Sequence, residues 1–403
     1  MNIWIFNHYA ITPDMPGGTR HYDLSRELIK KGYNVTIFAS SYNYVTRREE
    51  RLRGGESFKL EWVNGIRYVW LKTFPYSKND WRRALNWLSY AVRVIFFCIK
   101  IKEKPDVIIG SSVHLFAPFA AYALSRLKRS KFIFEVRDLW PQTLIDIGSM
   151  SKNHPLIIFF RLLERFLYRH ADKIITLLPN AGDYIKKFGI SKETIVWIPN
   201  GVDISSFHNN SIGENYISSK FTIMYLGAHG RANALNVILD AGKILQDGGN
   251  NRIYFLLIGD GPEKNDLTKR AQSLGLKNIE FQAPIPKRYI QKIMSRANAF
   301  IFILTDSAVF KYGVSSNKLF GYMSAEKPVI FSCNSVNNPV NEVNAGLTVP
   351  PQNAEALADA AIKLYSLPAS ERKSMGRRGK QYVKKNHNIN RLTDKLVTVL
   401  NEL

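Results

Sequence analysis

The stretch FTIMYLGAHG at residues 221–230 decides how the fold of this chain is interpreted. Phe221–Tyr225 is an apolar run of strand length, and the glycine-containing turn Gly227-Ala228-His229-Gly230 follows it. Residues 236–246 then repeat apolar side chains at helical spacing. A strand, a turn and a helix in this order form the repeating unit of a doubly wound parallel sheet. Because this unit begins past the middle of the chain, the sequence predicts a second α/β domain here.

The same alternation of short apolar strands and helices occurs on both sides of this stretch. Further strands are expected at residues 2–7, 34–39, 106–110, 131–136, 173–177, 194–198, 254–258, 278–281, 299–303 and 329–331, and helices at 20–31, 353–366, 370–385 and 389–403. Residues 205–215 are polar and lack periodicity, which is typical of a linker. The pattern predicts an α/β fold of two facing, doubly wound, Rossmann-like domains with a cleft between them.

The domain boundaries follow from this pattern. We expect an N-terminal domain at residues 1–203, a linker at 204–220 and a C-terminal domain at 221–384. The last helix, within residues 385–403, is expected to pack back toward the N-terminal domain. Ligands of doubly wound sheets bind outside the carboxyl ends of the strands, so the loops after strands are the candidate binding loops.

Composition narrows the class of protein. The chain has 403 residues, 45% hydrophobic and 22% charged, which is typical of a globular protein and excludes a mostly disordered one. Cys98 and Cys333 are the only cysteines, so a disulfide scaffold is excluded and a reducing compartment is expected. The N-terminus lacks the features of a signal peptide, and no clean run of 18 apolar residues predicts a spanning helix.

The net charge of +23 predicts an acidic partner: nucleic acid, anionic lipid or a phosphorylated ligand. Residues 1–203 hold 31 basic and 18 acidic side chains, and residues 204–403 hold 25 and 15. Residues 47–104 alone hold 14 basic and 6 acidic ones. The charge is therefore shared between the domains, and the chain lacks a nucleic-acid-binding motif. We expect no nucleic acid partner.

Two helices are candidates for contact with a membrane. In residues 84–101, Asn86, Ser89, Arg93 and Lys100 recur at helical steps on one narrow stripe, and basic residues flank both ends within 82–104. Such a helix lies at a bilayer interface or is a core helix of a large domain, and both interpretations remain open. In residues 155–170, arginines recur every four residues, which also suits an ordinary solvated face.

Three loops have the chemistry of phosphate sites. The first holds Gly17 and Gly18 before a helix, and the second is Gly227–Gly230 followed by Arg231. The third, residues 313–318, brings Ser315, Ser316, Asn317 and Lys318 to a helix start. Backbone N–H groups at helix starts, together with an ammonium or guanidinium group, hold a diphosphate. Plain tight turns are the alternative for the diglycine loop.

Metal catalysis and a serine triad have little support. The sequence contains no DxD, HxH, CxxC or GxSxG pattern, so no metal site is expected. The eight histidines are scattered, and we interpret most of them as packing or surface residues. His114 and His229 follow expected strands and therefore remain candidates for a functional role.

Four segments in register resemble glycosyltransferase family 4, a family of retaining enzymes with two Rossmann domains (GT-B). They are Ile198-Pro199-Asn200-Gly201-Val202-Asp203, Gly259-Asp260-Gly261-Pro262, residues 322–330 and residues 345–358. Their order and spacing extend over nearly the whole chain. The resemblance implies a UDP-sugar donor in the C-terminal domain and an acceptor in the N-terminal domain. The absence of metal-ligand motifs predicts that the reaction requires no metal.

Arg137-Asp138-Leu139-Trp140-Pro141 resembles the branch of the family that makes bacterial surface polysaccharides, including O-antigen L-fucosamine transferases. This resemblance implies transfer of an N-acetylated aminosugar such as L-FucNAc in O-antigen, lipopolysaccharide, capsule or exopolysaccharide synthesis. The implied acceptor is a lipid-linked sugar on polyprenyl diphosphate. The implied location is the cytoplasmic face of the inner membrane, contacted peripherally through residues 82–104. A sugar-nucleotide epimerase on the same fold is the first alternative, and a nucleic-acid-binding protein, suggested only by the charge, is a distant second.

The resemblance also implies the site residues, with departures from the family pattern. The diphosphate-binding Arg and Lys of the family fall at Ala228 and Asn233, so we expect Arg231 and Lys318 to supply that charge. The family's paired glutamates fall near Gly313 and Gly321, and Glu326 is a candidate substitute. The expected catalytic residues are Arg137, Asp138, Arg231 and Lys318. The expected nucleotide-sugar-binding residues are Gly17, Gly18, Gly227, His229, Gly230, Asn233, Gly259, Ile285, Ser315, Ser316, Asn317, Leu319 and Gly321.

Overall fold

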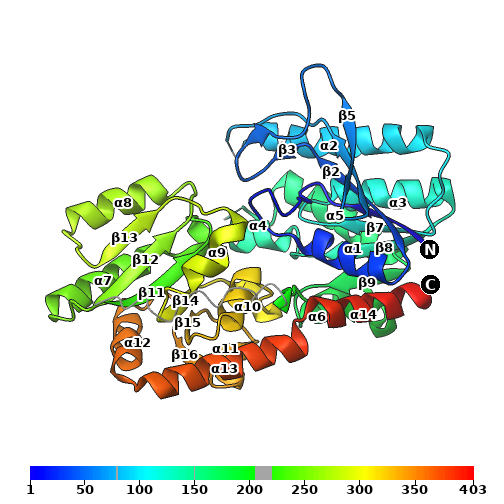
Figure 1. The fold of residues 1–403 in the computed structure, drawn as a ribbon. Coiled ribbons are helices and arrows are strands. Elements are labelled where there is room, and N and C mark those ends of the chain that lie inside the picture. The colour runs from blue at the N-terminus through cyan, green and yellow to red at the C-terminus, as the bar shows by residue number, and fades with distance from the viewer. Residues whose placement is uncertain (79, 149, 205–219) are drawn as a thin grey trace. The chain divides into compact units, whose positions relative to one another are not determined.

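The computed structural model describes residues 1–78, 80–148, 150–204 and 220–403, and the chain forms two compact units (Figure 1). Unit 1 consists of Met1–Asn200 together with Ile389–Leu403, and unit 2 consists of Gly201–Asn388. Residues 205–219 of the predicted linker lie outside the described residues. Two Rossmann-like α/β units are observed, as the sequence predicts.

Unit 1 is built on one sheet with the strand order β10-β9-β8-β7-β1-β2-β6-β5. All neighbours pair in parallel except β5 and β6, which are antiparallel. The strands are β1 (Asn2–Phe6), β2 (Asn34–Ser40), β5 (Phe58–Val63), β6 (Ile66–Leu71), β7 (Val107–Ser111), β8 (Lys131–Val136), β9 (Lys173–Thr176) and β10 (Ile195–Trp197), with a separate hairpin of β3 (Tyr42–Asn43) and β4 (Arg48–Glu49). The central strands are buried on both faces because helices cover the sheet on both sides.

The helices of unit 1 agree closely with the predicted ones where a prediction exists. They are α1 (Arg20–Lys30), α2 (Trp81–Lys100), α3 (Phe116–Lys128), α4 (Gln142–Asp146), α5 (Pro155–His170), α6 (Ala181–Ile185) and α14 (Ile389–Asn401). α14 packs on α1, so the last helix of the chain belongs to unit 1. β5, β6 and α3 were not predicted from the sequence. β5 escaped prediction because this edge strand is Phe-Lys-Leu-Glu-Trp-Val, which alternates exposed and half-buried residues and lacks the apolar run of a central strand.

Unit 2 has the parallel strand order β13-β12-β11-β14-β15-β16. The strands are β11 (Phe221–Leu226), β12 (Ile253–Ile258), β13 (Ile279–Gln282), β14 (Ala299–Ile303), β15 (Val329–Ser332) and β16 (Gly346–Val349). The helices are α7 (Asn236–Asp247), α8 (Lys264–Ser273), α9 (Lys287–Met294), α10 (Asn317–Ser324), α11 (Pro339–Glu342), α12 (Ala354–Ser366) and α13 (Ala369–Asn386). Counted along the chain, the strands are arranged 3-2-1-4-5-6, which is the order of the dinucleotide-binding fold.

The strand order locates the ligand edge of each unit. The order reverses between β1 and β7 in unit 1 and between β11 and β14 in unit 2. Ligands of open α/β sheets bind beside the carboxyl ends of the strands at such a reversal. The candidate loops are therefore those that follow these four strands.

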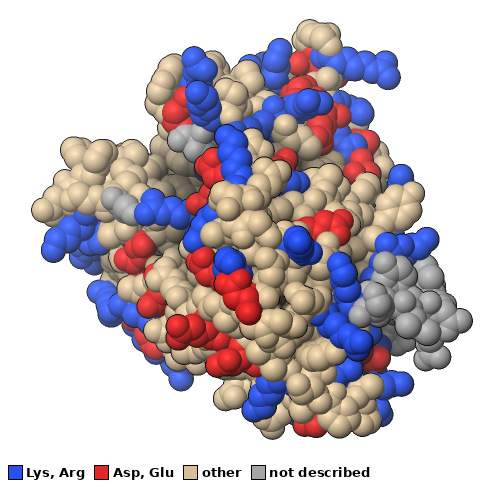
Figure 2. All heavy atoms as spheres, turned by 90° about the vertical axis from the view of Figure 1, so that its left-hand side faces the viewer, with Lys and Arg blue, Asp and Glu red and all other residues tan. Residues whose placement is uncertain are grey.

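The structure shows how the surface charge is distributed and how α2 packs. On the face drawn in Figure 2, basic side chains form several separate groups with acidic ones among them, rather than a single basic band. Asn86, the first residue of the polar stripe on α2, is fully buried. Its amide donates to Thr73 Oγ1 at 2.9 Å and to the Phe74 carbonyl at 2.7 Å. In the described part of the chain, no helix combines the length and the hydropathy needed to span a bilayer.

Candidate functional site

The loop after β11 packs directly against the loop after β12, and glycines make this packing possible. A Cβ on Gly259 would lie 1.9 Å from the Gly227 carbonyl oxygen, and one on Gly261 would lie 2.3 Å from that of His229. The backbone N–H of His229 donates to the Asp260 carbonyl at 2.9 Å. The Gly-Asp-Gly-Pro turn therefore supports the loop that begins at Gly227.

Lys318 brings a cation to this loop from the first turn of α10. Its Nζ donates to Asn233 Oδ1 at 2.6 Å and to Tyr225 Oη at 3.1 Å. A Cβ on Gly227 would lie 2.7 Å from Lys318 Cδ, so the glycine leaves room for the lysine. Burial lowers the pKa of Lys318 to about 8, and no ion pair joins it to a carboxylate within the described residues. An ammonium group in this setting gains from an anionic ligand.

The side chains around Lys318 are held by the same loop. Tyr225 Oη donates to the Ala228 carbonyl at 2.8 Å, and the Asn233 amide donates to that carbonyl at 3.0 Å. The backbone N–H of Thr305, in the loop after β14, donates to the Ala232 carbonyl at 3.0 Å. The loops on both sides of the strand reversal are thus joined. Arg231 lies in the same loop, and it is exposed to solvent.

The start of α10 presents backbone donors next to Lys318. Ser316 precedes the helix, and its hydroxyl makes no capping hydrogen bond to the first turn. The preceding loop is fixed by Asn337, which accepts from the Val314 N–H at 2.7 Å and donates to the Val314 carbonyl at 2.9 Å. The first N–H groups of a helix lack intrahelical acceptors. Together with the Lys318 ammonium they can bind a diphosphate.

His229 lies buried in the loop after β11. It is fully buried, and neither ring nitrogen has a hydrogen-bond partner. Burial, with smaller contributions from Lys264 and Lys318 and an opposing one from Asp260, lowers its pKa to about 4. The imidazole is therefore neutral near pH 7. As a neutral group it can donate or accept one hydrogen bond without adding charge.

The remaining predicted residues of unit 2 differ in burial and therefore in the atoms that a ligand can reach. Gly230 and Ile285 are half-buried, and Leu319 is fully buried, so only the backbone of Leu319 is available to a ligand. A Cβ on Gly321 would meet open space. Glu326, the candidate substitute for the family glutamates, follows the C-terminal end of α10 and pairs with Lys380 at 3.1 Å.

Unit 1 holds the other predicted residues at its own ligand edge. Gly17 has φ +133°, and a Cβ there would lie 2.8 Å from Ile11 Cδ1 and 2.9 Å from Tyr44 Oη, so a glycine is required. Gly18 is exposed. After β8, the Arg137 N–H donates to Ser112 Oγ at 3.0 Å. Neighbouring protein atoms raise the pKa of Asp138, and the Arg137 guanidinium partly offsets this effect.

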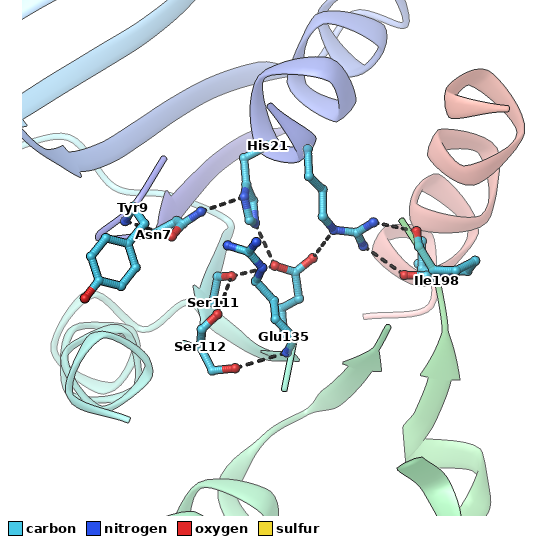
Figure 3. A network of polar contacts seen from close by, with 10 residues as sticks. Asn7, Tyr9, His21, Ser111, Ser112, Glu135 and Ile198 are labelled. Carbon is cyan, nitrogen blue, oxygen red and sulfur yellow. Dashed lines mark hydrogen bonds and ion pairs between the residues drawn. The ribbon is translucent and has the colours of Figure 1, made fainter. Parts of the chain in front are cut away.

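A buried polar network at the start of α1 was not predicted from the sequence (Figure 3). Glu135 Oε1 accepts from Arg20 Nε at 2.9 Å, and Oε2 lies 2.6 Å from His21 Nε2 and 2.6 Å from Ser111 Oγ. Asn7 Oδ1 accepts from the Tyr9 N–H, so the Asn7 amide nitrogen donates to His21 Nδ1 at 2.7 Å. His21 Nε2 therefore carries the hydrogen donated to Glu135, and burial lowers the pKa of this imidazole.

Arg20 extends this network to the end of unit 1. Its guanidinium donates to the Ile198 carbonyl at 2.9 Å and to the Pro199 carbonyl at 2.5 Å. The network joins α1, β7, β8 and the chain just before unit 2. Neighbouring His21 and Arg20 hold the pKa of Glu135 well below its usual range. No periodicity links residues so far apart in sequence, so no sequence signal could have found this cluster.

A second buried pair lies at the same edge of unit 1. His8 Nδ1 lies 2.9 Å from His114 Nε2, after β1 and β7 respectively. Burial lowers the pKa of His8 to about 3 and that of His114 well below its usual value. His114 was a candidate for function, and the structure places it in the interior among aromatic rings that include Trp87. Within the described residues, no group of three or more metal-ligating side chains occurs.

Comparison with known proteins identifies both units. The model of the family described as Glycosyltransferase Family 4 matches residues 17–206. The model of the family described as Glycosyl transferases group 1 matches residues 220–366. The first match ends and the second begins within 20 residues of the boundary between the two units at residues 200 and 201.

Similar proteins come from bacteria. The chain is 23% identical to the putative colanic acid biosynthesis glycosyl transferase WcaI of Escherichia coli K12, over 67% of this chain and 69% of that protein. It is 22% identical to the probable glycosyltransferase WbjE of Pseudomonas aeruginosa, over 74% and 76%. It is also 22% identical to the O-antigen chain mannosyltransferase C of Escherichia coli, over 62% and 70%.

Solved structures share the whole architecture. Sucrose-phosphate synthase from Thermosynechococcus elongatus has a TM-score of 0.76 and 16% identity, over 100% of this chain and 98% of that one. Anabaena Alr3699/HepE, solved in complex with UDP and glucose, has a TM-score of 0.70 and 13% identity, over 100% and 99%. The fold is that of the GT-B glycosyltransferases. The chain carries a family 4 and a group 1 glycosyltransferase domain.

Proposed function

We propose that this glycosyltransferase binds a UDP-sugar in unit 2 and transfers the sugar to a lipid-linked acceptor bound in unit 1. The observation that carries the donor site is the Lys318 ammonium group, which has a lowered pKa and no carboxylate partner within the described residues. Arg231 lies exposed in the same loop and adds a second cation. Alr3699/HepE, which has this fold, was solved with UDP and glucose bound, and that complex supports a nucleotide-sugar donor.

In this proposal the catalytic contribution of unit 2 is electrostatic. Negative charge develops on the departing diphosphate as the bond to the sugar breaks. Lys318, Arg231 and the first N–H groups of α10 stabilise that charge, which lowers the barrier. In a retaining reaction the leaving diphosphate itself takes the acceptor proton, so a strong protein base is not required. Arg137 and Asp138, after β8, act on the acceptor in unit 1.

Asn233 and Lys318 together explain how the site replaces a missing family residue. The family lysine falls at Asn233, whose side chain cannot carry charge. In the structure, Asn233 Oδ1 instead holds Lys318 Nζ at 2.6 Å. The Lys318 ammonium group is therefore hydrogen-bonded to the residue that stands where the family has its lysine. Glu326 does not take the place of the family glutamate that falls at Gly321 in this proposal, because its carboxylate pairs with Lys380.

The acceptor belongs to bacterial polysaccharide synthesis in this proposal, since similar proteins are named for colanic acid and O-antigen. We propose an N-acetylated aminosugar as the transferred group and a polyprenyl-diphosphate-linked sugar as the acceptor. The enzyme then works at the cytoplasmic face of the inner membrane. No metal is proposed to take part, so transfer should continue in the presence of EDTA.

The test uses the purified full-length chain with a panel of nucleoside diphosphate sugars. Thermal stability is measured with each compound, and a ligand at 100 times its Kd adds about 2.7 kcal/mol of stability. The donor that shifts the melting temperature is then incubated with membrane lipid extract. Radiolabelled sugar in the lipid fraction supports the proposal. Isomerised free UDP-sugar indicates an epimerase, and no shift with any nucleotide sugar refutes the donor site.

A further inference from the structure

Three helices of unit 1 expose an unusual number of large apolar side chains. α2, α3 and α5 pack as neighbours, α2 on α3 and α3 on α5 (Figure 1). The exposed apolar residues on them are Trp81, Leu85, Leu88, Val92, Phe96, Ile99, Phe119, Leu127, Leu156, Ile158, Phe159 and Leu162. Soluble monomers rarely expose so many together, and such surfaces mark interaction sites. We refer to this surface as the α2–α3–α5 face.

On α2 the exposed apolar residues form one continuous stripe. From Trp81 to Ile99 they follow one another at steps of 4, 3, 4, 4 and 3 residues. These steps keep the side chains on one side of a helix along its whole length. Trp81 is 65% exposed and Phe96 is 63% exposed, so neither is covered by the rest of the unit. The opposite side of α2 already packs into the unit through residues such as Tyr90 and Val94.

The charge on these helices has a single sign. Their basic residues are Arg82, Arg83, Arg93, Lys100, Arg126, Lys128, Arg161, Arg165 and Arg169. Glu164 is their only acidic residue, and it is fully buried. Its carboxyl accepts from the hydroxyls of Tyr168 and Tyr184 at 2.9 and 3.0 Å, and burial raises its pKa to about 8. The three helices therefore present no carboxylate to the solvent.

We propose that the α2–α3–α5 face binds the surface of an anionic bilayer. Apolar side chains enter the boundary between headgroups and acyl chains, while guanidinium and ammonium groups bind lipid phosphates. A protein partner would need a matching apolar and acidic surface, whereas an anionic membrane offers both features at once. The contact is wider than residues 82–104, because α5 contributes Leu162, which is 64% exposed, and three arginines.

This inference deepens the proposed function by assigning the surface that meets the lipid phase, but it does not depend on donor chemistry. The experiment measures binding of the full-length chain to vesicles of phosphatidylcholine alone and of phosphatidylcholine with phosphatidylglycerol. No nucleotide sugar is present. Binding to the anionic vesicles is expected, with at least about tenfold weaker binding to the neutral ones. Raising the salt concentration should weaken binding, because the cationic contribution is screened.

Paired variants separate the two contributions. Phe96→Ser with Leu162→Ser removes two exposed apolar groups and should weaken vesicle binding about tenfold. Trp62→Ser, on the exposed edge strand β5, is the matched control and should bind as the wild type does. For charge, the triple variant R161Q/R165Q/R169Q should lose binding to anionic vesicles. Its control is the triple variant K277Q/R377Q/K384Q, with exposed residues of unit 2.

Three results would overturn the inference. One is equal binding to neutral and anionic vesicles. Another is unchanged binding of the Phe96 and Leu162 variant while its melting temperature equals that of the wild type. The third is a stable dimer without lipid, detected by analytical ultracentrifugation, that the same variant abolishes, because a second copy of the chain then covers the face. A UDP-induced thermal shift in these variants reports on the donor site separately, so failure of one proposal leaves the other measurable.

Discussion

Replacing Lys318 by methionine should stabilise the free protein and remove its response to UDP. The lysine lies in the candidate donor site, where its pKa is lowered from 10.5 to about 8. A difference of this size corresponds to about 3 kcal/mol of penalty on the charged form. Lys318 is partly exposed to solvent, and the solvent screens part of that penalty. We expect a net gain of about 1–2 kcal/mol in the free energy of unfolding of K318M near pH 7.

The sign of this effect depends on pH in a defined way. The unfolded chain holds the Lys318 proton up to about pH 10.5, and the folded chain holds it only up to about pH 8. Below pH 8 both states are protonated and the wild type bears the full penalty. Between pH 8 and 10.5 the folded state releases its proton, and the wild type recovers stability. The advantage of K318M should therefore be constant below pH 8 and shrink toward zero by pH 10.5.

The assay is thermal unfolding with and without UDP at several pH values. A gain of 1–2 kcal/mol corresponds to roughly 2–8 °C in melting temperature for a domain of this size. K277M, at an exposed lysine of unit 2, is the matched control and should change neither stability nor the UDP response. If K318M is less stable than the wild type at pH 7 and still responds to UDP, Lys318 neither bears a burial penalty nor binds the diphosphate.

Three further predictions concern both units. A bound diphosphate raises the pKa of Lys318, so UDP should bind more weakly above pH 8 than at pH 7, and calorimetry in buffers of different ionisation enthalpy should detect proton uptake there. G321E should fold, because a Cβ at Gly321 meets open space. If the new glutamate accepts a hydrogen bond from the ribose, UDP should bind about tenfold more tightly. Unchanged or weaker UDP binding would contradict the hypothesis that Gly321 lacks a contact that the family glutamate makes. E135Q should cost about 3–5 kcal/mol in urea unfolding, because it leaves the buried Arg20 without its counter-ion. The pKa of Glu135 is held well below 4.5, so the wild type should lose this contribution as pH falls below about 4.5, whereas E135Q should show no such loss; parallel pH curves would count against the ion pair.

Much of the fold follows from local patterns. The expected helix at residues 155–170 coincides with α5, and the expected strands fall within one or two residues of the observed central ones. These elements are predictable because a strand buried on both faces is an uninterrupted apolar run, and a helix repeats apolar residues at its own period. The edge strand β5 escaped prediction, since an exposed edge strand has mixed composition.

The candidate site was predictable as a set of loops but not as a set of contacts. Glycines before helices marked the loops after β1 and β11, and Lys318 marked the start of α10. Nothing in the sequence pairs Lys318 with Asn233, which lies 85 positions earlier. The helical period of α2 was visible as well. The inward direction of Asn86 depends on Thr73 and the Phe74 carbonyl, which only packing brings within reach.

The sequence by itself determined two α/β units, the loops that are candidates for ligand binding, and a surplus of positive charge shared between the halves. It could do so because hydrophobic periodicity and turn chemistry act over a few residues along the chain. Only the tertiary structure decided which side of α2 faces the solvent, that Glu135 neutralises Arg20, and that Lys318 has no carboxylate partner among the described residues. Burial and ion pairing depend on residues that are distant in sequence. Their energies are therefore set by the packed structure and not by any local pattern.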